Sequence, residues 1–285
     1  MADKLKIAGA QMEPALLEKE SNLSRCLGLL ETAAAQGAQL VVFPECTLTG
    51  YVFASMKEAL PACETVPGPS TESILAACRR LNVYAVAGLL EEDGGRFYNT
   101  AVLIGPQGLV GKHRKLHLPY IAVDRFLNHG NLPPTIYETE VGRIGLGICY
   151  DLMFPEFARV LTVKGADLIV LPTNWPELGE VFPDLILPAR AFENHVFCAA
   201  VNRVGEERGV KFFGRSTIVD WIGLTVAEGK AYEEDLIFGE IEPATSRERY
   251  MQVIPGEFEM HFDNDRRPEF YGALVEPLAD DSRIR

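Results

Sequence analysis

The segment that decides the fold reads GLGICYDLMFPEFAR and spans residues 145–159. It begins in an apolar strand expected over 143–149, breaks at the polar Asp151, and continues into a helix expected over 154–164. A glycine ends that helix, and a second apolar run, DLIVLP at 167–172, follows as a buried strand. A buried strand, a helix and another buried strand in succession predict two parallel strands with a helix packed against them.

The alternation of strands and helices extends in both directions from this segment. Upstream, apolar periodicity predicts strands at 5–10, 39–43, 83–90 and 98–105 and helices at 23–34 and 71–81. Ser21 or Asn22 is the expected N-cap of the first helix, and Gly37 its stop. Downstream, a helix near 184–195 precedes strands at 197–202, 216–220 and 236–241. Strands that first alternate with helices and later follow one another predict an α/β fold of mixed sheets covered by helices.

The composition is that of an ordinary globular protein. The chain has 285 residues, of which 47% are hydrophobic, and its net charge is −13. Because an acidic surface repels nucleic acid and anionic membranes, we expect neither as a partner. No run of 18 apolar residues occurs, the N-terminus lacks a signal-peptide pattern, and the six cysteines form no CxxC pair. We therefore expect free thiols and a cytoplasmic location.

No group of residues has the spacing of a metal or dinucleotide site. His113 and His117 lie four residues apart, but a basic segment surrounds them. The glycines at 142, 145 and 147 do not form a GxGxxG pattern and lie before and within a strand rather than after it. We expect no metal ion.

One cysteine stands where a nucleophile is expected. Cys149 ends the strand at 143–149 and precedes the sharp break into the helix. A turn from strand to helix exposes a nucleophile and supplies backbone N–H donors for an oxyanion, and a nearby helix N-terminus favours the thiolate. A lone cysteine after a strand is more often a packing residue, so this position alone does not decide between the two interpretations.

Two charged residues also lie at strand ends. Glu45 follows QLVVFP, and Lys115 follows a hairpin that ends in GKHRK. Taken singly, the glutamate is typical of a cap or surface charge, and the lysine of a solvated basic face. Together with Cys149 they supply a complete mechanism. The carboxylate takes the thiol proton and returns it to a departing amine, while the ammonium stabilises the oxyanion and lowers the thiol pKa.

Three motifs in this chain resemble those of the nitrilase superfamily, also called the carbon–nitrogen hydrolase family. They are LVVFPECTLTGY (40–51), GKHRKLHLP (111–119) and GLGICYDLMFPEFAR (145–159). Further matching text stands at 165–176, GADLIVLPTNWP, and at 190–220. The resemblance covers nearly the whole chain, and three separate motifs in the right order are far more specific than any one of them.

The resemblance implies a fold, a site and an assembly. The fold is a four-layer α-β-β-α sandwich, and the site is a Glu-Lys-Cys triad at Glu45, Lys115 and Cys149 without a cofactor. The assembly is a homodimer or larger homo-oligomer that pairs sandwiches. We expect one domain over 1–285, in which residues 255–285 form an oligomerisation tail, because this polar end holds four aromatics that need a surface to pack on: Phe258, Phe262, Phe270 and Tyr271.

The chain departs from the family pattern after the lysine. Some members carry a further glutamate there, before an aromatic-rich stretch that ends in Pro-Gly. This chain reads YIAVDRFLNHGN, where Asp124 is the nearest carboxylate and His129 stands in place of the usual proline. Two interpretations stay open for Asp124: a carboxylate of the site that binds substrate or acts as a fourth catalytic residue, or a loop residue that pairs with Arg125 or caps a turn.

Other candidates for substrate contact lie just after the strands that carry the triad. They are Tyr51, Tyr150, Asn174 and Trp175, for which ordinary loop packing is the alternative. The predicted function is a cysteine hydrolase that cleaves a non-peptide carbon–nitrogen bond of a small amide or N-carbamoyl compound through a thioester and releases ammonia. The alternatives are a nitrilase, an acyltransferase that passes the acyl group to an amine, and a catalytically inactive binding scaffold.

Overall fold

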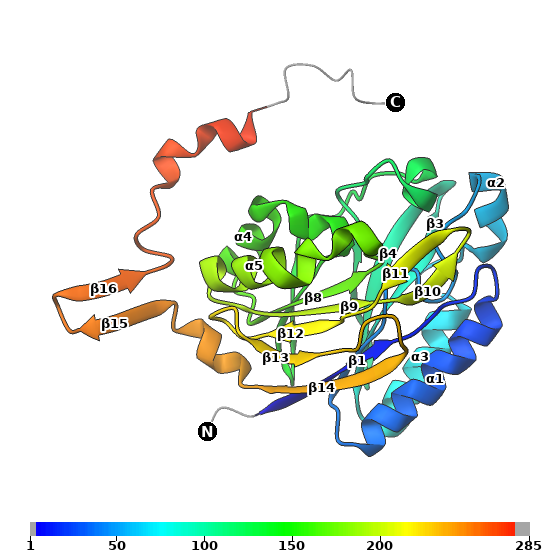
Figure 1. The fold of residues 1–285 in the computed structure, drawn as a ribbon, viewed down its shortest axis with the longest axis horizontal. Helices are drawn as coiled ribbons and strands as arrows, with labels where there is room; N and C mark the ends of the chain where they lie inside the picture. The colour runs from blue at the N-terminus through cyan, green and yellow to red at the C-terminus, as the bar shows by residue number, and fades with distance from the viewer. Residues whose placement is uncertain (1–3, 277–285) are drawn as a thin grey trace. The chain divides into compact units, whose positions relative to one another are not determined.

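A computed structural model describes residues 4–276 of the chain (Figure 1). The chain divides into two compact units, Met1–Glu248 and Arg249–Arg285. Among residues 4–276, both six-stranded sheets and the α-helices belong to the first unit. The second unit contributes a hairpin and two short 3₁₀ helices to the described residues. Among residues 4–276, no helix has the length and apolar character needed to cross a membrane.

The first six-stranded sheet carries the N-terminal half of the unit. Its strand order is β14-β1-β2-β3-β4-β5. Strands β1, β2 and β3 run parallel, and the other neighbours are antiparallel, so the sheet is mixed. Its strands are β1 (Leu5–Gln11), β2 (Leu40–Val42), β3 (Tyr84–Asp93), β4 (Arg96–Gly105), β5 (Gly108–Arg114) and β14 (Asp235–Ile241).

The second six-stranded sheet has the order β13-β12-β9-β8-β7-β6. Strands β7, β8 and β9 are parallel, as the apolar runs around the GLGICYD segment predict, and the outer neighbours are antiparallel. Its strands are β6 (Ile136–Thr139), β7 (Gly142–Leu146), β8 (Leu168–Thr173), β9 (Phe197–Asn202), β12 (Thr217–Val219) and β13 (Thr225–Glu228).

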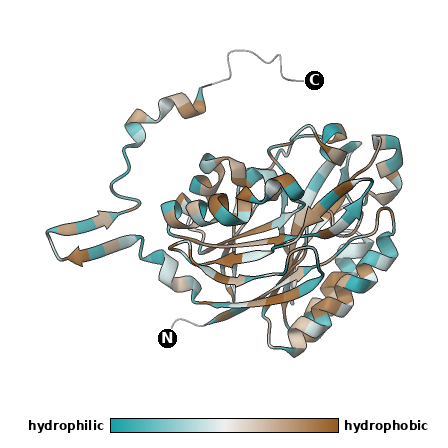
Figure 2. Cartoon of the chain, viewed as in Figure 1, coloured by the Kyte–Doolittle hydropathy of each residue, from teal (hydrophilic) through white to brown (hydrophobic). Residues whose placement is uncertain are grey.

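Helices cover the outer face of each sheet. Helices α1 (Lys19–Ala35) and α3 (Pro69–Leu81) share a core with the first sheet, in which Leu30 and Ile74 contact residues such as Val41. Helices α4 (Pro155–Val163) and α5 (Leu187–Asn194) share another core with the second sheet. Figure 1 shows the two helix pairs on opposite sides of the strands, and Figure 2 shows apolar residues along the strands and polar ones alternating around α1.

A third core joins the two sheets face to face. Side chains from β1, β2 and β3 meet side chains from β7, β8 and β9 there, and all of them are buried. Burial of so many aliphatic side chains is the main free-energy source for holding the layers together. The prediction of a four-layer α-β-β-α sandwich with two mixed sheets is therefore confirmed.

The expected cap of the first helix is wrong. Helix α1 begins one turn earlier, after Glu18, and Asn22 lies inside it. The Asn22 side chain instead holds the preceding loop, because it accepts from Ala15 N at 2.8 Å and donates to Ala15 O at 2.7 Å. Gly37 follows the helix with φ +85°, a conformation that favours glycine, as its role as a stop predicts.

Short elements complete the first unit. A π-helical turn, η5 (Phe182–Ile186), precedes α5, so the helix expected near 184–195 is α-helical only from Leu187. The hairpin of β10 (Val204–Glu207) and β11 (Val210–Phe213) was not among the expected elements. The remaining short helices are α2 (Met56–Ala59), η1 (Leu60–Ala62), η2 (Ala122–Phe126), η3 (Cys149–Met153), η4 (Glu177–Gly179) and η6 (Pro243–Arg247).

The second unit begins at Arg249, earlier than the tail expected from residue 255. It consists of an antiparallel pair, β15 (Tyr250–Ile254) and β16 (Phe258–His261), followed by η7 (Pro268–Phe270) and η8 (Gly272–Val275). Most of its large apolar side chains are exposed, including Phe258, Phe270 and Tyr271. Residues 277–285 of the expected tail lie outside the described residues.

Candidate active site

Three strand ends bring the predicted triad together. Glu45 lies just beyond β2, Lys115 follows β5 directly, and Cys149 lies just beyond β7. All three side chains are buried. The Nζ atom of Lys115 donates to Glu45 Oε1 at 2.7 Å, and Cys149 interacts electrostatically with both charged groups.

The segment that carries Glu45 passes over a glycine. A Cβ atom on Gly88 of β3 would lie 2.4 Å from Cys46 N and 2.8 Å from Glu45 Cα, which is closer than backbone atoms allow. Cys46 itself has φ +48°, a conformation rare for non-glycine residues. Gly88 therefore permits the close approach that places Glu45 in the site.

Lys115 is held through both its backbone and its ammonium group. Its N–H donates to Asn99 O at 2.8 Å, and its carbonyl accepts from Gly130 N at 2.8 Å. The ammonium donates to Asp124 Oδ2 at 2.6 Å as well as to Glu45. Burial alone would lower the pKa of Lys115, but the carboxylates of Asp124 and Glu45 hold it well above its ordinary value. The lysine is therefore positively charged at neutral pH.

Asp124 is part of this cluster. Its carboxylate is buried in η2, binds the Lys115 ammonium, and accepts from the hydroxyl of Tyr51 at 2.9 Å. Arg125 instead donates its Nε to Ala122 O. The interpretation of Asp124 as the partner of Arg125 is therefore wrong, and two predicted site residues, Asp124 and Tyr51, lie beside the lysine.

Cys149 occupies the strained turn that the sequence predicts. Its φ is +44°, and it is the first residue of η3, between β7 and α4. A non-glycine residue in this conformation costs roughly 1–3 kcal/mol and is often found at functional sites. The strain places the thiol at the junction of strand and helix, among residues of the core under the second sheet.

The expectation of a low thiol pKa needs correction. Burial and the Glu45 carboxylate raise the pKa of Cys149 well above its ordinary value. Lys115 and a hydrogen bond from the Asn174 backbone act in the opposite direction without overcoming the rise. The α-helical N-terminus is at Pro155 rather than beside the thiol. Cys149 at rest is therefore a protonated thiol that needs a base.

Burial also raises the pKa of Glu45, although Lys115 opposes the shift. A carboxylate with a raised pKa is a better proton acceptor, and its protonated form remains a donor near neutral pH. Oxygen Oε1 of Glu45 takes the contacts described above, whereas buried Oε2 has no hydrogen-bond partner among residues 4–276. One carboxylate oxygen thus remains available for proton transfer.

Asp151 joins the turn of Cys149 to the segment of Lys115. One of its oxygens accepts from the backbone N–H groups of Leu116 at 3.2 Å and His117 at 3.1 Å. The other accepts from Ile148 N at 3.0 Å and contacts His113 Nε2 at 2.9 Å. His117 also contacts Asp151 through its ring, because His117 Nδ1 lies 2.7 Å from Asp151 Oδ1. The two histidines that lie four residues apart in the sequence therefore both bind this carboxylate.

The other predicted contact residues lie close to the thiol. Asn174 donates its backbone N–H to Cys149, and neither polar atom of its buried side chain has a partner among the described residues. Trp175 belongs to the same core as Cys149 and stacks on Phe182 with ring centroids 5.0 Å apart. Tyr150 is half-buried and packs edge-on against Phe154.

Asn99, which the sequence did not single out, contacts the three charged residues of the cluster, Glu45, Asp124 and Lys115. Asn99 lies in β4 and is buried. Its Nδ2 donates to Glu45 Oε1 at 2.7 Å and to Asp124 Oδ1 at 3.0 Å. The available signal was a polar residue inside the apolar run YNTAVLIG, since a buried amide must find hydrogen-bond partners.

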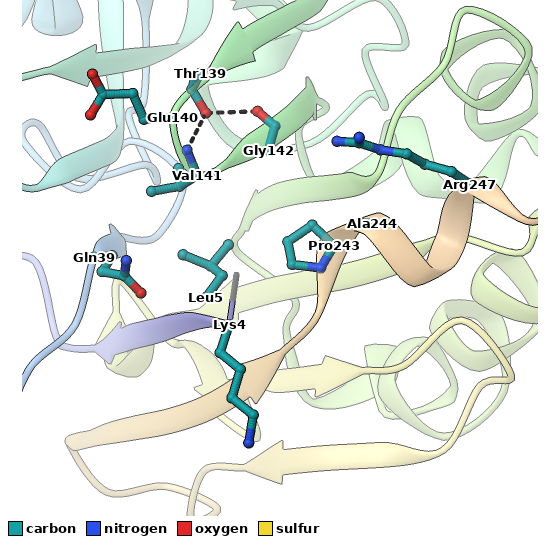
Figure 3. A pocket seen from close by; sticks show the side chains of 10 residues that line it. All are labelled: Lys4, Leu5, Gln39, Thr139, Glu140, Val141, Gly142, Pro243, Ala244 and Arg247. Carbon is teal, nitrogen blue, oxygen red and sulfur yellow. Dashed lines mark hydrogen bonds between the residues drawn. The ribbon is translucent and has the colours of Figure 1, made fainter. Parts of the chain in front are cut away.

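A cavity of about 320 Å³ lies elsewhere, at the opposite end of β7 from Cys149. Lys4, Gln39 and Pro243 are among its lining residues, as Figure 3 shows. The cationic Arg247 beside it is already bound to the buried Asp167. Lys4 and Glu140 are charged residues of this lining, but no cysteine lines the cavity.

Comparison with known families shows to which family the chain belongs. Residues 6–250 match the model of the family described as Carbon-nitrogen hydrolase. The chain belongs to the carbon–nitrogen hydrolase family. The resemblance to the nitrilase superfamily is thereby confirmed, and the match includes all the residues of the cluster described above.

Curated relatives of this hydrolase carry two kinds of name. A nitrilase from Pyrococcus abyssi is 38% identical over 94% of this chain and 99% of its own length. An omega-amidase from Xenopus laevis is 34% identical over 79% of this chain and 84% of its own length. The human omega-amidase is 32% identical over the same shares.

Solved structures of similar proteins support the fold. A carbon-nitrogen hydrolase from Helicobacter pylori has a TM-score of 0.81 and is 22% identical, covering 97% of this chain and 99% of that one. An amidase from Nesterenkonia has a TM-score of 0.78 and is 24% identical, covering 96% and 98%. At these identities the likeness concerns the fold alone.

Proposed function

We propose that this hydrolase is an amidase that cleaves the carbon–nitrogen bond of a small carboxamide or N-carbamoyl compound and releases ammonia. The observation that carries the proposal is the state of the cluster around Cys149. A buried thiol lies with a carboxylate whose Oε2 has no partner among residues 4–276, and with an ammonium held by two carboxylates. A nucleophile, a base and an oxyanion stabiliser are the parts that acyl transfer from an amide requires.

The first half of the reaction forms a thioester. Glu45 takes the proton of Cys149, and the sulfur attacks the carbonyl carbon to form a tetrahedral oxyanion. Lys115 and backbone N–H groups of the turn stabilise the negative oxygen. Glu45 then gives its proton to the departing nitrogen, the carbon–nitrogen bond breaks, and ammonia leaves.

The second half returns the thiol. Glu45 takes a proton from one water molecule, and the resulting hydroxide attacks the thioester carbonyl. When the second tetrahedral intermediate collapses, the carbon–sulfur bond breaks and Cys149 regains a proton from Glu45. The products are a carboxylic acid, or a carbamic acid from a carbamoyl compound, and the resting enzyme. No cofactor enters these steps.

Buried polar groups without hydrogen-bond partners suggest where the substrate binds. The side chain of Asn174 is buried without a hydrogen-bond partner among the described residues, and so is Nε1 of Trp175. Leaving a buried polar group unpaired costs about 1–3 kcal/mol, which a bound polar molecule would offset. We propose that Asn174 and Trp175, together with Tyr51, Tyr150 and Asp124, form the substrate site.

A nitrilase is the second candidate, because the Pyrococcus abyssi relative carries that name. A nitrile would form a thioimidate on Cys149, and its linear nitrogen would need repeated protonation before water could release ammonia. The amide route asks for one proton at the nitrogen, which the single unpaired oxygen of Glu45 can deliver.

The test is a matched pair of substrates that carry the same side chain as an amide and as a nitrile. Ammonia release gives kcat/KM for each compound across a panel of small amides, N-carbamoyl compounds and nitriles. We expect every preferred substrate to be an amide or carbamoyl compound. A tenfold higher kcat/KM for the nitrile of a pair would reverse the assignment, and no ammonia from any compound would favour a binding scaffold.

We also propose a cytoplasmic homo-oligomer. All six cysteines are free thiols, which is typical of proteins in a reducing compartment. Exposed apolar side chains of α4 and α5 include Val160, Val163 and Phe192, and more are exposed in the second unit. Exposed apolar groups of this kind are typical of surfaces that bind another protein chain.

A further inference from the structure

Asn99 donates to both carboxylates of the cluster, as Lys115 does, but its donor is an uncharged amide. Its Nδ2 carries two hydrogens and lies 2.7 Å from Glu45 Oε1 and 3.0 Å from Asp124 Oδ1. The thiol of Cys46 lies 3.6 Å from Asn99 Oδ1 and donates to it. Because each atom of the carboxamide has a partner of the right kind, the orientation of the amide is determined.

The backbone of Asn99 reaches the third charged group. Its carbonyl accepts the N–H of Lys115 at 2.8 Å, in the last contact between β4 and the residue that follows β5. One buried residue therefore fixes the main chain of the lysine and the side chains of both carboxylates. Sheet hydrogen bonds on β4 hold Asn99 in turn, since it pairs with Leu90 of β3.

These contacts determine how Glu45 is turned. Asn99 and Lys115 both donate to Oε1, so that oxygen is fully engaged. Oε2 is buried and has no partner among the described residues. The two oxygens of a carboxylate are equivalent, so a half-turn about its last bond restores the same arrangement, but any partial rotation breaks both contacts. The pair of donors therefore keeps one oxygen of Glu45 toward its partners and leaves the other unengaged.

We propose that Asn99 is a positioning residue that acts through Glu45: its amide keeps the carboxylate ionised at rest and turned so that Oε2 exchanges protons with the thiol and the departing nitrogen. The inference rests on the proposed function for the identity of those reacting groups. It assigns Asn99 no contact with the substrate. The cluster holds two carboxylates and a single ammonium. Asn99 adds hydrogen-bond donors for the carboxylates without adding a charge.

The proposal predicts a change in the pH profile as well as in rate. A donor favours the charged form of the carboxylate that it binds, so removal of the donor raises the pKa of Glu45. Asn99→Leu keeps the side chain's size and removes both hydrogen bonds. We expect kcat to fall about 10- to 100-fold, with KM within about threefold, because the lost interaction involves a charged group in the reacting cluster. The acid limb of the kcat profile moves up by about 1 pH unit.

A second variant separates charge from packing. Asn99→Asp keeps the shape and replaces a donor with a third acidic group between Glu45 and Asp124. Two neighbouring carboxylates resist ionising together, so the acid limb of Asn99→Asp moves further up than that of Asn99→Leu. If Asn99 served only in packing, both variants would keep the wild-type pH profile. Asn99→Leu would then be less stable than Asn99→Asp, because leucine replaces the whole polar group.

Asn22 provides the matched control. It is buried, and its amide donates to Ala15 O at 2.7 Å and Leu48 O at 3.2 Å, outside the cluster. Asn22→Asp and Asn22→Leu therefore repeat the same chemical changes in another buried amide. We expect both to lower the melting temperature and to leave the pH profile and the kcat of the folded enzyme within twofold of wild type.

The closing experiment measures two quantities for each variant against pH: ammonia release from the best amide, and the rate at which iodoacetamide modifies Cys149, followed by peptide mass. The second quantity needs no substrate. We expect the acid limb of both profiles to move upward in the Asn99 variants only. If wild type releases ammonia and the Asn99 variants keep its kcat and both profiles, the inference is wrong and the function stands. If no amide is cleaved, the function fails, and the modification profile alone decides on Asn99.

Discussion

Both the ring and the backbone N–H of His117 bind one oxygen of Asp151. The ring nitrogen Nδ1 lies 2.7 Å from Asp151 Oδ1, and the backbone nitrogen lies 3.1 Å from it. His117 follows Lys115 by two residues, and Asp151 follows Cys149 by two. The contact therefore joins two segments of different sheets and sets the spacing between the ammonium and the nucleophile.

Substitution of Asp151 by asparagine should impair this spacing. An amide has one acceptor oxygen, so its NH₂ group would face donors that now bind a carboxylate, such as Leu116 N or Ile148 N. We expect turnover to fall about 10- to 100-fold and the protein to become less stable, because charged hydrogen bonds are lost. Asp167→Asn is the control, since Asp167 is equally buried but binds Arg143 and Arg247 away from the site. It should lower stability and leave turnover per folded molecule unchanged.

The same carboxylate contributes to acid sensitivity. Burial would raise the pKa of Asp151, but hydrogen bonds from His113 and His117 hold it well below its ordinary value. A group whose pKa is lower in the folded state stabilises the fold above its unfolded pKa of about 4, and this contribution is lost as pH falls toward the folded pKa. Unfolding by urea should therefore show less loss of stability in acid for Asp151→Asn than for wild type. If the free energy of unfolding falls equally with decreasing pH in both proteins, this explanation is wrong.

The reactive residues could be predicted because each follows a strand that is readable from the sequence. The β-branched run before Glu45 and the apolar run before Cys149 mark the ends of β2 and β7. Parallel strands of one sheet end at the same edge, and sheet packing then brings the two edges together. The sequence thus indicated Glu45, Lys115 and Cys149, and the resemblance to the family implied the layers that carry them.

The interactions within the cluster could not be predicted in the same way. Asn99 looks like an interior strand residue, and its contact with Asp124 depends on how β4 aligns with the loop after β5. The thiol pKa depends on burial, which no local motif reports, so a lysine in the sequence suggested a thiolate that the folded site does not favour. Non-local packing decided both cases.

Cys149 should be the only cysteine whose loss abolishes turnover. We expect Cys149→Ala to fold normally and to release no ammonia, because the other thiol near Glu45, that of Cys46, is hydrogen-bonded to Asn99 Oδ1. Cys63 is the informative control, because it is the one half-buried cysteine and its pKa is raised by burial to about 11. Cys63→Ser should keep full activity. Inactivation by iodoacetamide with the label on Cys46 or Cys198, and none on Cys149, would show that the nucleophile is misassigned.

The two charged partners should each matter to rate more than to folding. Glu45→Gln keeps an oxygen for Lys115 and Asn99 but removes the base, and Lys115→Ala removes the charge that stabilises the oxyanion. One oxyanion donor contributes roughly 10²–10³ in rate, and we expect each variant to lose at least that factor in kcat. Circular dichroism checks folding. Glu64→Gln, in a buried carboxylate that binds Ser70, serves as the control. Near-normal turnover in either partner variant would remove that residue from the mechanism.

Gly88 should be a sensitive position although it has no side chain. In Gly88→Ala the new methyl group would lie 2.4 Å from Cys46 N, so the chain at Glu45 must move. A displacement of about 1 Å in a reacting group can cost about 100-fold in rate, and we expect a loss of that size with the fold retained. Gly28→Ala in α1 is the control, because it adds the same methyl group where no atom outside the neighbouring helix backbone lies within 4 Å. It should stabilise the protein slightly and keep full activity.

The second unit should be needed for assembly. Its exposed apolar side chains include Phe270 at 71%, Leu274 at 63% and Val275 at 85%, values that are unfavourable for a chain end surrounded by water. Because the unit begins at Arg249, a chain that ends at Glu248 tests it more cleanly than one that ends at Pro255. We expect light scattering to give a dimer or larger for the full chain, and a monomer or aggregate for the shortened one. Phe270→Ser tests the same surface without deletion and should weaken association at micromolar concentration. A monomeric full-length protein at that concentration would contradict the proposed assembly, whereas unchanged mass in both variants would move the interface to the exposed faces of α4 and α5.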